Sequence, residues 1–397
     1  MRATPSAGGV SRSWSRGGVV SKSSKRSTRL RVTAGDKPDP WIVGVTVLLA
    51  LIGCVFVLDT TFFYSQQYYG DGYSMALRQG AALIAGGGLA WMLSRCRSDR
   101  IERWAPGLFA GALLLTVLPL IPGIGHCAKG ACRWIDAGPI RMQPSELAKV
   151  AFVAYLAATL TRKGTKLRDW RYGLLPTLAV TGVFAALLLK EPDFGTTVLV
   201  VALGCAMMFL AGVPLRHLLL VLVPAVAGAV ALVHGDDIRL RRLLCFSDPW
   251  EDPTGACYQI VQSYRTFGSG GLAGIGIGAS TQKAGWLPEA HTDYVFAVIG
   301  EEAGLIGATI VLLCFCLLAY RGFRVAHRHP ESFGQLLAAG ITLALVSQAL
   351  FNMGVVLGLL PPKGLVLPFF SYGGSSLLIT MAAMGVLMSL SRELRER

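Results

Sequence analysis

Apolar segments about 20 residues long recur from residue 42 to the C-terminal end, and they constrain the fold of this chain more than any other feature. A helix of about 20 apolar residues crosses the hydrocarbon core of a bilayer with its backbone polar groups bonded internally. The chain is 53% hydrophobic and 15% charged, whereas soluble domains carry roughly 25% charged residues. The pattern therefore predicts an all-α polytopic membrane protein and excludes a globular enzyme with one anchor.

Ten segments are predicted to span the membrane as helices. They cover residues 42–63, 75–94, 105–122, 144–161, 172–189, 195–212, 217–234, 292–319, 335–357 and 371–390. Together they form a predicted membrane domain over residues 41–391. The KEPDFG segment at 190–195 fits either a loop or a polar break inside a longer hairpin.

Lys and Arg residues predict the orientation. With the N-terminus in the cytoplasm, 25 of the 37 Lys and Arg residues fall in the N-terminal tail, the inner loops and the C-terminal residues 392–397. Since inner segments of membrane proteins are enriched in these residues, both termini are predicted to be cytoplasmic. Large outer loops then cover about 123–143 and, between spans seven and eight, 235–291. The net charge of +14 is explained as an orientation signal, without a nucleic-acid partner.

Residues 1–40 are rich in Ser, Arg, Lys and Gly and have no apolar core. This composition predicts a disordered basic tail, either solvated or in contact with anionic lipid. It is not typical of a cleavable signal peptide, because no apolar region occurs early enough.

Four of the nine cysteines lie in the two large outer loops, as Cys127 with Cys132 and Cys245 with Cys257. Two cysteines per outer loop indicate two local disulfides in an oxidising compartment, with free thiols as the alternative. Neither pair has CxxC spacing or a nearby histidine cluster, so a zinc site is disfavoured.

Ionisable residues gather where the eighth span begins. The segment LPEAHTDYVFAVIGEE, residues 287–302, contains Glu289, His291, Asp293, Glu301 and Glu302. Carboxylates inside a membrane indicate a functional site by default, with a proton relay or buried structural hydrogen bonding as alternatives for the two deeper glutamates. Small residues at 297, 300 and 304 follow Asp293 on the same helical face, where another helix or a lipid chain would fit.

Two lysines mark further candidate positions at outer helix ends. In QPSELAK, residues 143–149, Pro144 opens a helix, and Glu146 and Lys149 share one face. This is either a structural ion pair or a functional one. Lys363, in LLPPKGLVLP, is either a lysine that extends to the membrane interface or a functional cation.

The glycine-rich segment GSGGLAGIGIG, residues 268–278, superficially suggests a nucleotide-binding loop. That interpretation is rejected because no strand precedes it and no βαβ unit follows. The glycines instead predict a backbone that re-enters a protein-lined cavity near the membrane surface.

These motifs, in order, resemble the SEDS family, the shape, elongation, division and sporulation proteins. The resemblance covers residues 42–391 and rests on QPSELAK, GSGGLAGIGIG, QKAGWLPEAHTDYVFAVIGEEAG and LLPPKGLVLPFFSYGGSS. It is greatest for the division members, with the rod-elongation members as the alternative. Pro362, Tyr294 and the outer cysteine pairs depart from the usual family pattern, but no proposed catalytic group is missing.

The resemblance implies a peptidoglycan glycosyltransferase that polymerises lipid II at the outer face of the bacterial cytoplasmic membrane, at the division septum. Expected partners are a class B penicillin-binding protein and other division-complex membrane proteins. The position matching Asp293 is catalytic in the family, and those matching Glu146, Lys149 and Lys363 are functionally important. The further expected substrate-binding residues are Arg133, Gln259, Lys283, Glu289, His291 and Ser371.

The chemistry needs a base for the acceptor hydroxyl and cations for the pyrophosphate leaving group. Asp293 lies at the outer end of a predicted membrane helix, where the dielectric constant is low. It is therefore expected to have a raised pKa and to act as the base. Arg133, Lys149, Lys363 and the arginines at 239, 241 and 242 are candidate cations. No cofactor is required by the sequence, although Mg²⁺ or Mn²⁺ at the pyrophosphate is compatible with it.

Two other functions are compatible with the sequence alone. A lipid II flippase would also need many spans and intramembrane carboxylates, but it predicts polar residues on both sides and often repeated halves. The polar motifs here stay on the outer side, and no clear repeat is found. A division scaffold would recruit partners through its spans and tail, and it would not need Asp293.

Overall fold

The computed structural model describes residues 37–128, 131–137, 140–235 and 237–394. Contacts divide the chain into Met1–Val32 and Thr33–Arg397, and all described residues belong to the second unit. The predicted basic tail, residues 1–40, lies almost entirely outside the described residues.

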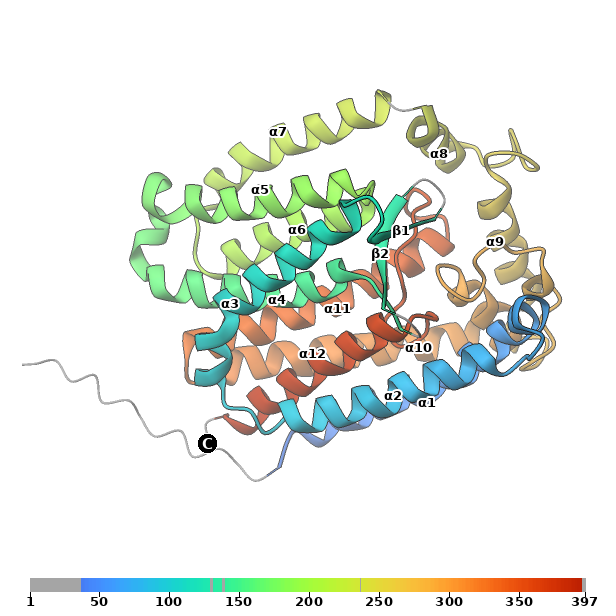
Figure 1. Cartoon of the computed structure of the whole chain (residues 1–397), viewed down its shortest axis with the longest axis horizontal. Helices are drawn as coiled ribbons and strands as arrows, with labels where there is room; N and C mark the ends of the chain where they lie inside the picture. Colours follow the sequence, from blue (N-terminus) through green and yellow to red (C-terminus); the bar gives the residue numbers. More distant parts are fainter. Residues whose placement is uncertain (1–36, 129–130, 138–139, 236, 395–397) are drawn as a thin grey trace, which may run out of the picture. The chain divides into compact units, whose positions relative to one another are not determined.

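Ten long helices coincide with the ten predicted spans (Figure 1). They are α1 (Pro40–Tyr69), α2 (Ser74–Leu93), α3 (Ser98–Val117), α4 (Pro144–Lys163), α5 (Leu175–Lys190), α6 (Phe194–Leu210), α7 (Leu215–His234), α10 (Val295–Arg328), α11 (Ser332–Val356) and α12 (Gly374–Arg392). Among the described residues, seven helical segments are long and apolar enough to cross a membrane. They contain all of these helices except α2, α4 and α6, for which a transmembrane path stays a prediction.

Local sequence signals set the helix ends. Helix α1 begins at Pro40, and the Asp39 side chain accepts a hydrogen bond from the Trp41 amide at 2.9 Å. The helix ends at Gly70, whose φ of 72° is in the left-handed region that glycine adopts without steric cost. Proline likewise opens α4 and α5, where its missing amide hydrogen is not needed.

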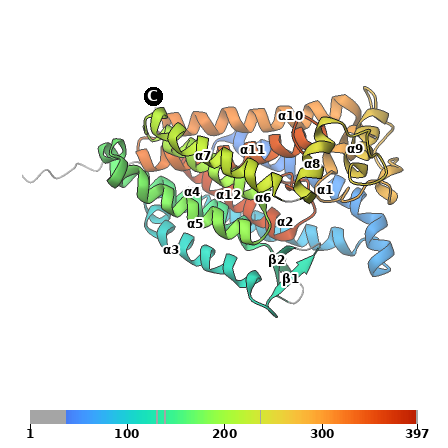
Figure 2. The same cartoon turned by 90° about the horizontal axis from the view of Figure 1, so that it is seen from above.

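The long helices run side by side, as Figures 1 and 2 show from two directions. Helices α2 and α12 approach closely because small residues lie between them: a Cβ atom on Gly385 would be 2.5 Å from the Ala90 carbonyl oxygen. Helix α12 is mostly buried, whereas only 6% of the most apolar part of α7 is buried by the rest of the chain. An apolar helix so exposed is suited to face lipid.

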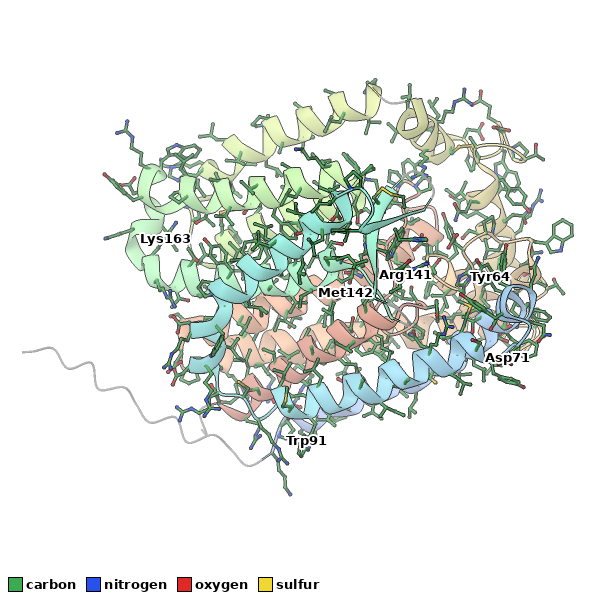
Figure 3. All side chains as sticks on the ribbon, viewed as in Figure 1. Tyr64, Asp71, Trp91, Arg141, Met142 and Lys163 are labelled. Carbon is green, nitrogen blue, oxygen red and sulfur yellow. A yellow bond between two sulfur atoms is a disulfide. The ribbon has the colours of Figure 1, made fainter. Side chains whose placement is uncertain are left out.

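The predicted inner and outer segments lie at opposite ends of the helices. Arg141 and Tyr64, from outer segments, lie toward one end, whereas Trp91 and Lys163 lie toward the other (Figure 3). Which end faces the cytoplasm stays a prediction.

The first outer loop contains a three-stranded antiparallel sheet that the sequence did not predict. Its order is β1 (Gly125–Ala128), β2 (Ala131–Ala137) and β3 (Ile140–Met142). A disulfide joins Cys127 in β1 to Cys132 in β2. The short strands lack a long alternating pattern, so they were not distinguishable from loop.

The second outer loop contains two helices, α8 (Asp237–Ser247) and α9 (Tyr258–Ser269), joined by a Cys245–Cys257 disulfide. Four short helical turns complete the described chain. They are η1 (Leu118–Leu120), η2 (Gly164–Arg168), η3 (Trp170–Leu174) and η4 (Gln282–Ala284).

The glycine-rich loop after α9 packs into a break in α10. At the break, Gly304 has φ 67° and ψ −168°. The amides of Ile275 and Gly276 donate to the carbonyl oxygens of Glu301 and Glu302, each at 3.0 Å. Irregular backbone inside a membrane protein is tolerated where protein supplies such hydrogen bonds. The loop therefore packs against protein, and its re-entry near the membrane surface stays a prediction.

The small residues that follow Asp293 do not form an open groove for lipid. Asp293 lies before α10, and a Cβ atom on Gly300 would overlap the Phe267 ring of α9. Gly304 lies against the backbone of Gly274. Chain segments, not a lipid tail, fill this face.

Candidate functional site

A tight turn places Asp293 immediately before α10. Glu289 has φ 56°, and its carbonyl oxygen accepts hydrogen bonds from the amides of Thr292, Asp293 and Tyr294 at 3.1–3.2 Å. The Thr292 hydroxyl donates to the Glu289 carboxylate at 2.7 Å. Glu289 thus organises the turn, and Asp293 is half-buried.

The segment between α11 and α12 lies directly against Asp293. A Cβ atom on Gly364 would lie 2.5 Å from Oδ2 of Asp293, so only glycine leaves room for the carboxylate. The buried Asn352 amide donates to the carbonyl oxygens of Asp293 and Leu365, at 2.7 and 2.6 Å. One side chain of α11 therefore joins the two segments, and Lys363 is held next to this contact.

Ser371 and His291 strengthen the same junction through backbone contacts. The Ser371 hydroxyl donates to the Thr292 carbonyl oxygen, and the Tyr372 amide donates to the His291 carbonyl oxygen at 2.8 Å. The His291 ring lies 4.6 Å, centroid to centroid, from the Tyr64 ring of α1. In the structure both residues position the turn that carries Asp293.

The α5–α6 turn brings an aromatic ring to Lys363. The ammonium nitrogen of Lys363 lies 3.5 Å from the centroid of the Phe194 ring. A Cβ atom on Gly195 would touch the Lys363 side chain at 3.6 Å. The KEPDFG segment is thus a turn between two helices and forms one wall around the lysine.

Arg133 holds this turn from the outer sheet. Its guanidinium donates to the carbonyl oxygens of Glu191, at 3.0 Å, and Pro192, and it lies 3.8 Å from the Asp193 carboxylate. Asp193 in turn accepts from the Thr196 amide at 3.1 Å and caps α6. The structure gives Arg133 an anchoring position near Lys363 instead of a free guanidinium.

The same turn contains a buried carboxyl that the sequence did not single out. Glu191 is 0% exposed, and neither carboxyl oxygen has a hydrogen-bond partner among the described residues. Burial, followed by the Asp193 charge, raises the pKa of Glu191 to about 8, although the Arg133 charge opposes the rise. Near neutral pH this carboxyl is therefore largely protonated.

Glu146 and Lys149 form a buried ion pair that connects three helices. The Lys149 ammonium lies 2.7 Å from the Glu146 carboxylate in α4 and 2.7 Å from the Gln348 side-chain oxygen in α11. Gln348 also donates to the Val366 carbonyl oxygen at 2.9 Å, and Ser376 in α12 donates to Glu146 at 3.3 Å. The pair is thus linked to the segment that carries Lys363 and Gly364.

Lys283 belongs to a different polar cluster, although the sequence grouped it with the substrate-binding residues. Its side chain is 1% exposed and pairs with Asp59 of α1 and with Glu302, at 2.6 Å for the latter. Glu302 also accepts from the amides of Gly278 and Ser280, at 3.0 and 3.1 Å. These contacts hold the glycine-rich loop in place. They agree with the alternative in which Glu301 and Glu302 make buried structural hydrogen bonds.

The remaining polar candidates lie on the outer helices. Gln259 of α9 donates to the Pro288 carbonyl oxygen at 3.4 Å, so it also supports the turn before α10. Arg241 and Arg242 of α8 are exposed. The Arg239 side chain lies outside the described part of the chain.

Sequence profiles place this chain in a known family. The FtsW, RodA and SpoVE profile, described as cell cycle protein, matches residues 40–396. A protein named probable peptidoglycan glycosyltransferase FtsW from Geobacter metallireducens is 40% identical over 92% of this chain and 98% of its own length. Stage V sporulation protein E of Bacillus subtilis is 38% identical, covering 91% and 98% of the two chains.

Solved structures share the fold over nearly the whole chain. One comes from the study "Structural coordination of polymerization and crosslinking by a peptidoglycan synthase complex", with a TM-score of 0.75, 31% identity and coverage of 89% and 98%. Thermus thermophilus rod shape determining protein RodA matches with a TM-score of 0.67 and 29% identity, covering 91% and 98%. This chain is therefore a helical multi-pass membrane protein that belongs to the FtsW, RodA and SpoVE family, the SEDS family that its motifs resemble.

Proposed function

We propose that this chain is a peptidoglycan glycosyltransferase of septal cell-wall synthesis, that its substrate is lipid II, and that Asp293 is its general base. Relatives at about 40% identity are named for glycosyltransferase activity. The observation that supports the residue assignment is the contact of Asp293 with the Gly364 backbone, since it brings a half-buried carboxylate next to the segment that carries Lys363.

The proposed step is a direct displacement. Asp293 takes the proton of the acceptor 4-hydroxyl, and that oxygen forms a bond to the anomeric carbon of the donor. The bond from this carbon to the pyrophosphate oxygen breaks, and undecaprenyl pyrophosphate leaves with the electron pair. Attack from the opposite face inverts an α-linked donor to a β-linked product, so no second carboxylate is needed as a nucleophile.

Cations would stabilise the negative charge of the leaving pyrophosphate. Lys363 is the best-placed candidate, because it adjoins the Asp293 contact and its charge is held over the Phe194 ring. Mg²⁺ or Mn²⁺ at the pyrophosphate is a further part of the proposal. Among the described residues no group of three His, Cys, Asp or Glu side chains could hold a metal ion, so such an ion would take most of its ligands from pyrophosphate and water.

The proposed setting is the outer face of the bacterial cytoplasmic membrane at the division septum. One structural relative comes from work on a peptidoglycan synthase complex that coordinates polymerization and crosslinking. By analogy, this chain would work beside a class B penicillin-binding protein and other membrane proteins of the division complex. The rod-elongation role of the RodA relatives is the alternative within the same reaction.

The test is polymerisation by the full chain together with its penicillin-binding partner, whose own active sites are blocked. Labelled lipid II is supplied in detergent, and glycan strands are resolved on a gel. Strands from this pair, and none from the blocked partner alone, are expected. Absence of strands combined with movement of lipid II across liposome membranes would instead establish the flippase function.

A further inference from the structure

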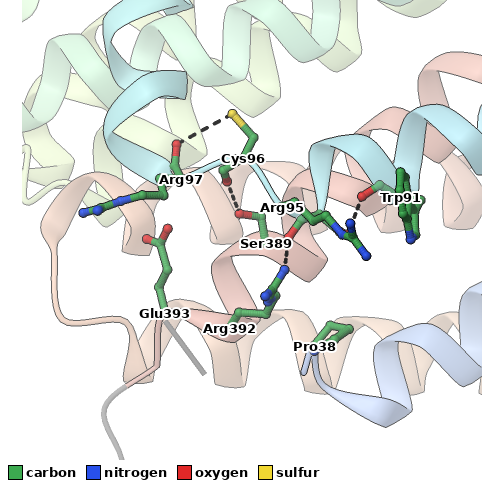
Figure 4. A pocket seen from close by; sticks show the side chains of 9 residues that line it. Pro38, Trp91, Arg95, Cys96, Arg97, Ser389, Arg392 and Glu393 are labelled. Carbon is green, nitrogen blue, oxygen red and sulfur yellow. Dashed lines mark hydrogen bonds between the residues drawn. The ribbon is translucent and has the colours of Figure 1, made fainter. Parts of the chain in front are cut away.

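The cysteines at the two ends of the helices are in different chemical states. Cys96, at the predicted cytoplasmic end, is a free thiol beside a pocket, and its Sγ donates to the Arg97 carbonyl oxygen at 3.9 Å (Figure 4). In the three-stranded sheet of the first outer loop, a disulfide joins Cys127 to Cys132. This bond ends one residue before Arg133 in β2, the residue that holds the α5–α6 turn.

Strands β1 and β2 pair with an irregular register next to the disulfide. His126 is opposite Trp134, whereas Cys127 is opposite Cys132. Arg133 is therefore the extra residue of a β-bulge in β2, with no residue of β1 opposite it in the described pairing. A bulge leaves its extra residue out of the ladder and changes the direction of that side chain.

The Arg133 guanidinium lies against the α5–α6 turn. It donates to two carbonyl oxygens of the turn, at 3.0 Å for that of Glu191, and lies 3.8 Å from the Asp193 carboxylate. Phe194 is the next residue, and its ring centroid lies 3.5 Å from the Lys363 ammonium nitrogen. Because the contact between the ring and the cation is attractive, the place of the turn affects the place of the lysine.

The disulfide selects this register over its nearest competitor. Without the bulge, the regular pairing that starts at His126 would continue, and Cys127 would lie opposite Arg133. The arginine would then join the ladder, and its side chain would change direction. A bond between Cys127 and Cys132 excludes that pairing, since it holds these two residues opposite each other.

The polar contacts of Asp136 in the same sheet do not distinguish the two registers. Its carboxylate lies 3.0 Å from Nδ1 of His126 and 2.9 Å from Nε of Arg141, and the three side chains are 40–55% exposed. Exposed ion pairs contribute little to stability. They also lie on the side of the bulge where both registers have the same pairing.

We propose that the Cys127–Cys132 disulfide positions Lys363 for the proposed reaction. By fixing the bulge, it fixes Arg133 on the α5–α6 turn, and the turn sets the place of the Phe194 ring beside the lysine. This rests on the proposed function, in which Lys363 stabilises the leaving pyrophosphate. The effect is therefore expected in kcat more than in KM, because that charge develops in the transition state.

The test compares variants of the full chain, assayed with lipid II and the blocked penicillin-binding partner. In Cys127→Ser, Cys132→Ser both registers become available, and kcat should fall about tenfold, within the 100-fold that a displacement of about 1 Å can cause. Cys127→Ser, Ala128→Cys allows a disulfide only in the register without the bulge, and kcat should fall at least as far. Asp136→Asn is the matched control and should stay within about twofold of wild type.

Two outcomes of these assays would overturn the proposal. One is a normal rate with the shifted disulfide, because any cross-link between the strands would then suffice. The other is an additive loss when Cys127→Ser, Cys132→Ser is combined with Arg133→Gln, because a disulfide that acts through the arginine adds nothing once the arginine is gone. Thermal scans and mass spectrometry confirm that each variant is folded and that the shifted disulfide has formed.

Acylation of the Lys363 amine, followed by peptide mass spectrometry, tests the positioning without any need for activity. The rate should change about threefold in both disulfide variants, the scale of a lost cation–π contact, and not in Asp136→Asn. Unchanged acylation in the disulfide variants would overturn the positioning even if wild type polymerises lipid II. The expected changes in a chain whose wild type forms no glycan strands would support the positioning and contradict the proposed function.

Discussion

Gly364 and Asp293 are in such close contact that a methyl group on the glycine would lie 2.5 Å from the carboxylate oxygen Oδ2. These residues are 71 positions apart in the sequence and come from segments that precede different helices, α12 and α10. The contact makes the position of the proposed base dependent on the segment that carries Lys363. A change in either segment should therefore alter the geometry of both groups.

Gly364→Ala is expected to reduce polymerisation by at least about 100-fold, because a displacement of about 1 Å in a reacting group has an effect of this size. The rate of glycan formation from lipid II measures the change. Gly268→Ala is the matched control, since a Cβ atom there meets nothing within 4 Å. Near-normal activity of Gly364→Ala would show that the carboxylate position is not critical.

Asn352→Asp is expected to weaken both stability and activity. The wild-type amide donates to two carbonyl oxygens, whereas a carboxylate offers only acceptors to them. Each buried carbonyl that loses its donor costs about 1–3 kcal/mol. The thermal midpoint and the polymerisation rate should fall together. An unchanged midpoint would show that Asn352 does not hold the segments of Asp293 and Leu365 together.

Lys149→Met should destabilise the protein by about 3–5 kcal/mol, because it leaves the buried Glu146 carboxylate unpaired. Addition of Glu146→Gln removes that charge and should restore more than half of the loss in thermal stability. If the double variant is folded but does not form glycan strands, the pair also has a role in the reaction. A double variant as unstable as Lys149→Met would contradict the ion-pair explanation.

Stability should depend on pH through Glu191. Its pKa is near 8 in the folded chain, above its ordinary value of 4.5, so the folded state binds the proton more tightly than the unfolded state. The stabilisation is complete below about pH 4.5 and is lost as the pH rises toward 8 and beyond. Glu191→Gln, whose side chain stays neutral, should make the thermal midpoint less dependent on pH between about pH 5 and 8. It should also raise the midpoint at pH 8.

Glu251→Gln, at an exposed position of the outer loop, serves as the control for that measurement. It should leave the pH dependence of the midpoint as in wild type. Identical curves for wild type and Glu191→Gln would show that the buried carboxyl has an ordinary pKa.

The helices were predictable because hydrophobicity acts locally: a run of 20 apolar residues indicates a span whatever its neighbours are. All ten predicted segments overlap helices, with ends shifted by up to nine residues. The three-stranded sheet was not predicted, since its pairing through Cys127 and Cys132 occupies only a few residues per strand.

The site was predictable only in part. Asp293 and Lys363 were identified from their motifs, and the structure brings their segments together. The roles of Asn352, Gly364 and Glu191 depend on contacts between residues far apart in sequence, which no local pattern contains. Lys283 was grouped with the substrate residues because it lies in the same motif as Asp293, yet its charge is used to bind Asp59 and Glu302.

The most direct measurement for the central claim is the rate of glycan formation by Asp293→Asn, assayed with the same blocked partner and the same lipid II as wild type. Asparagine keeps the size of the side chain but is uncharged and cannot take the proton of the acceptor hydroxyl. The rate should fall by about 10²–10⁴, the usual contribution of a general base, while lipid II binding and the thermal midpoint remain near wild type. A rate within a few-fold of wild type would show that Asp293 is not the base.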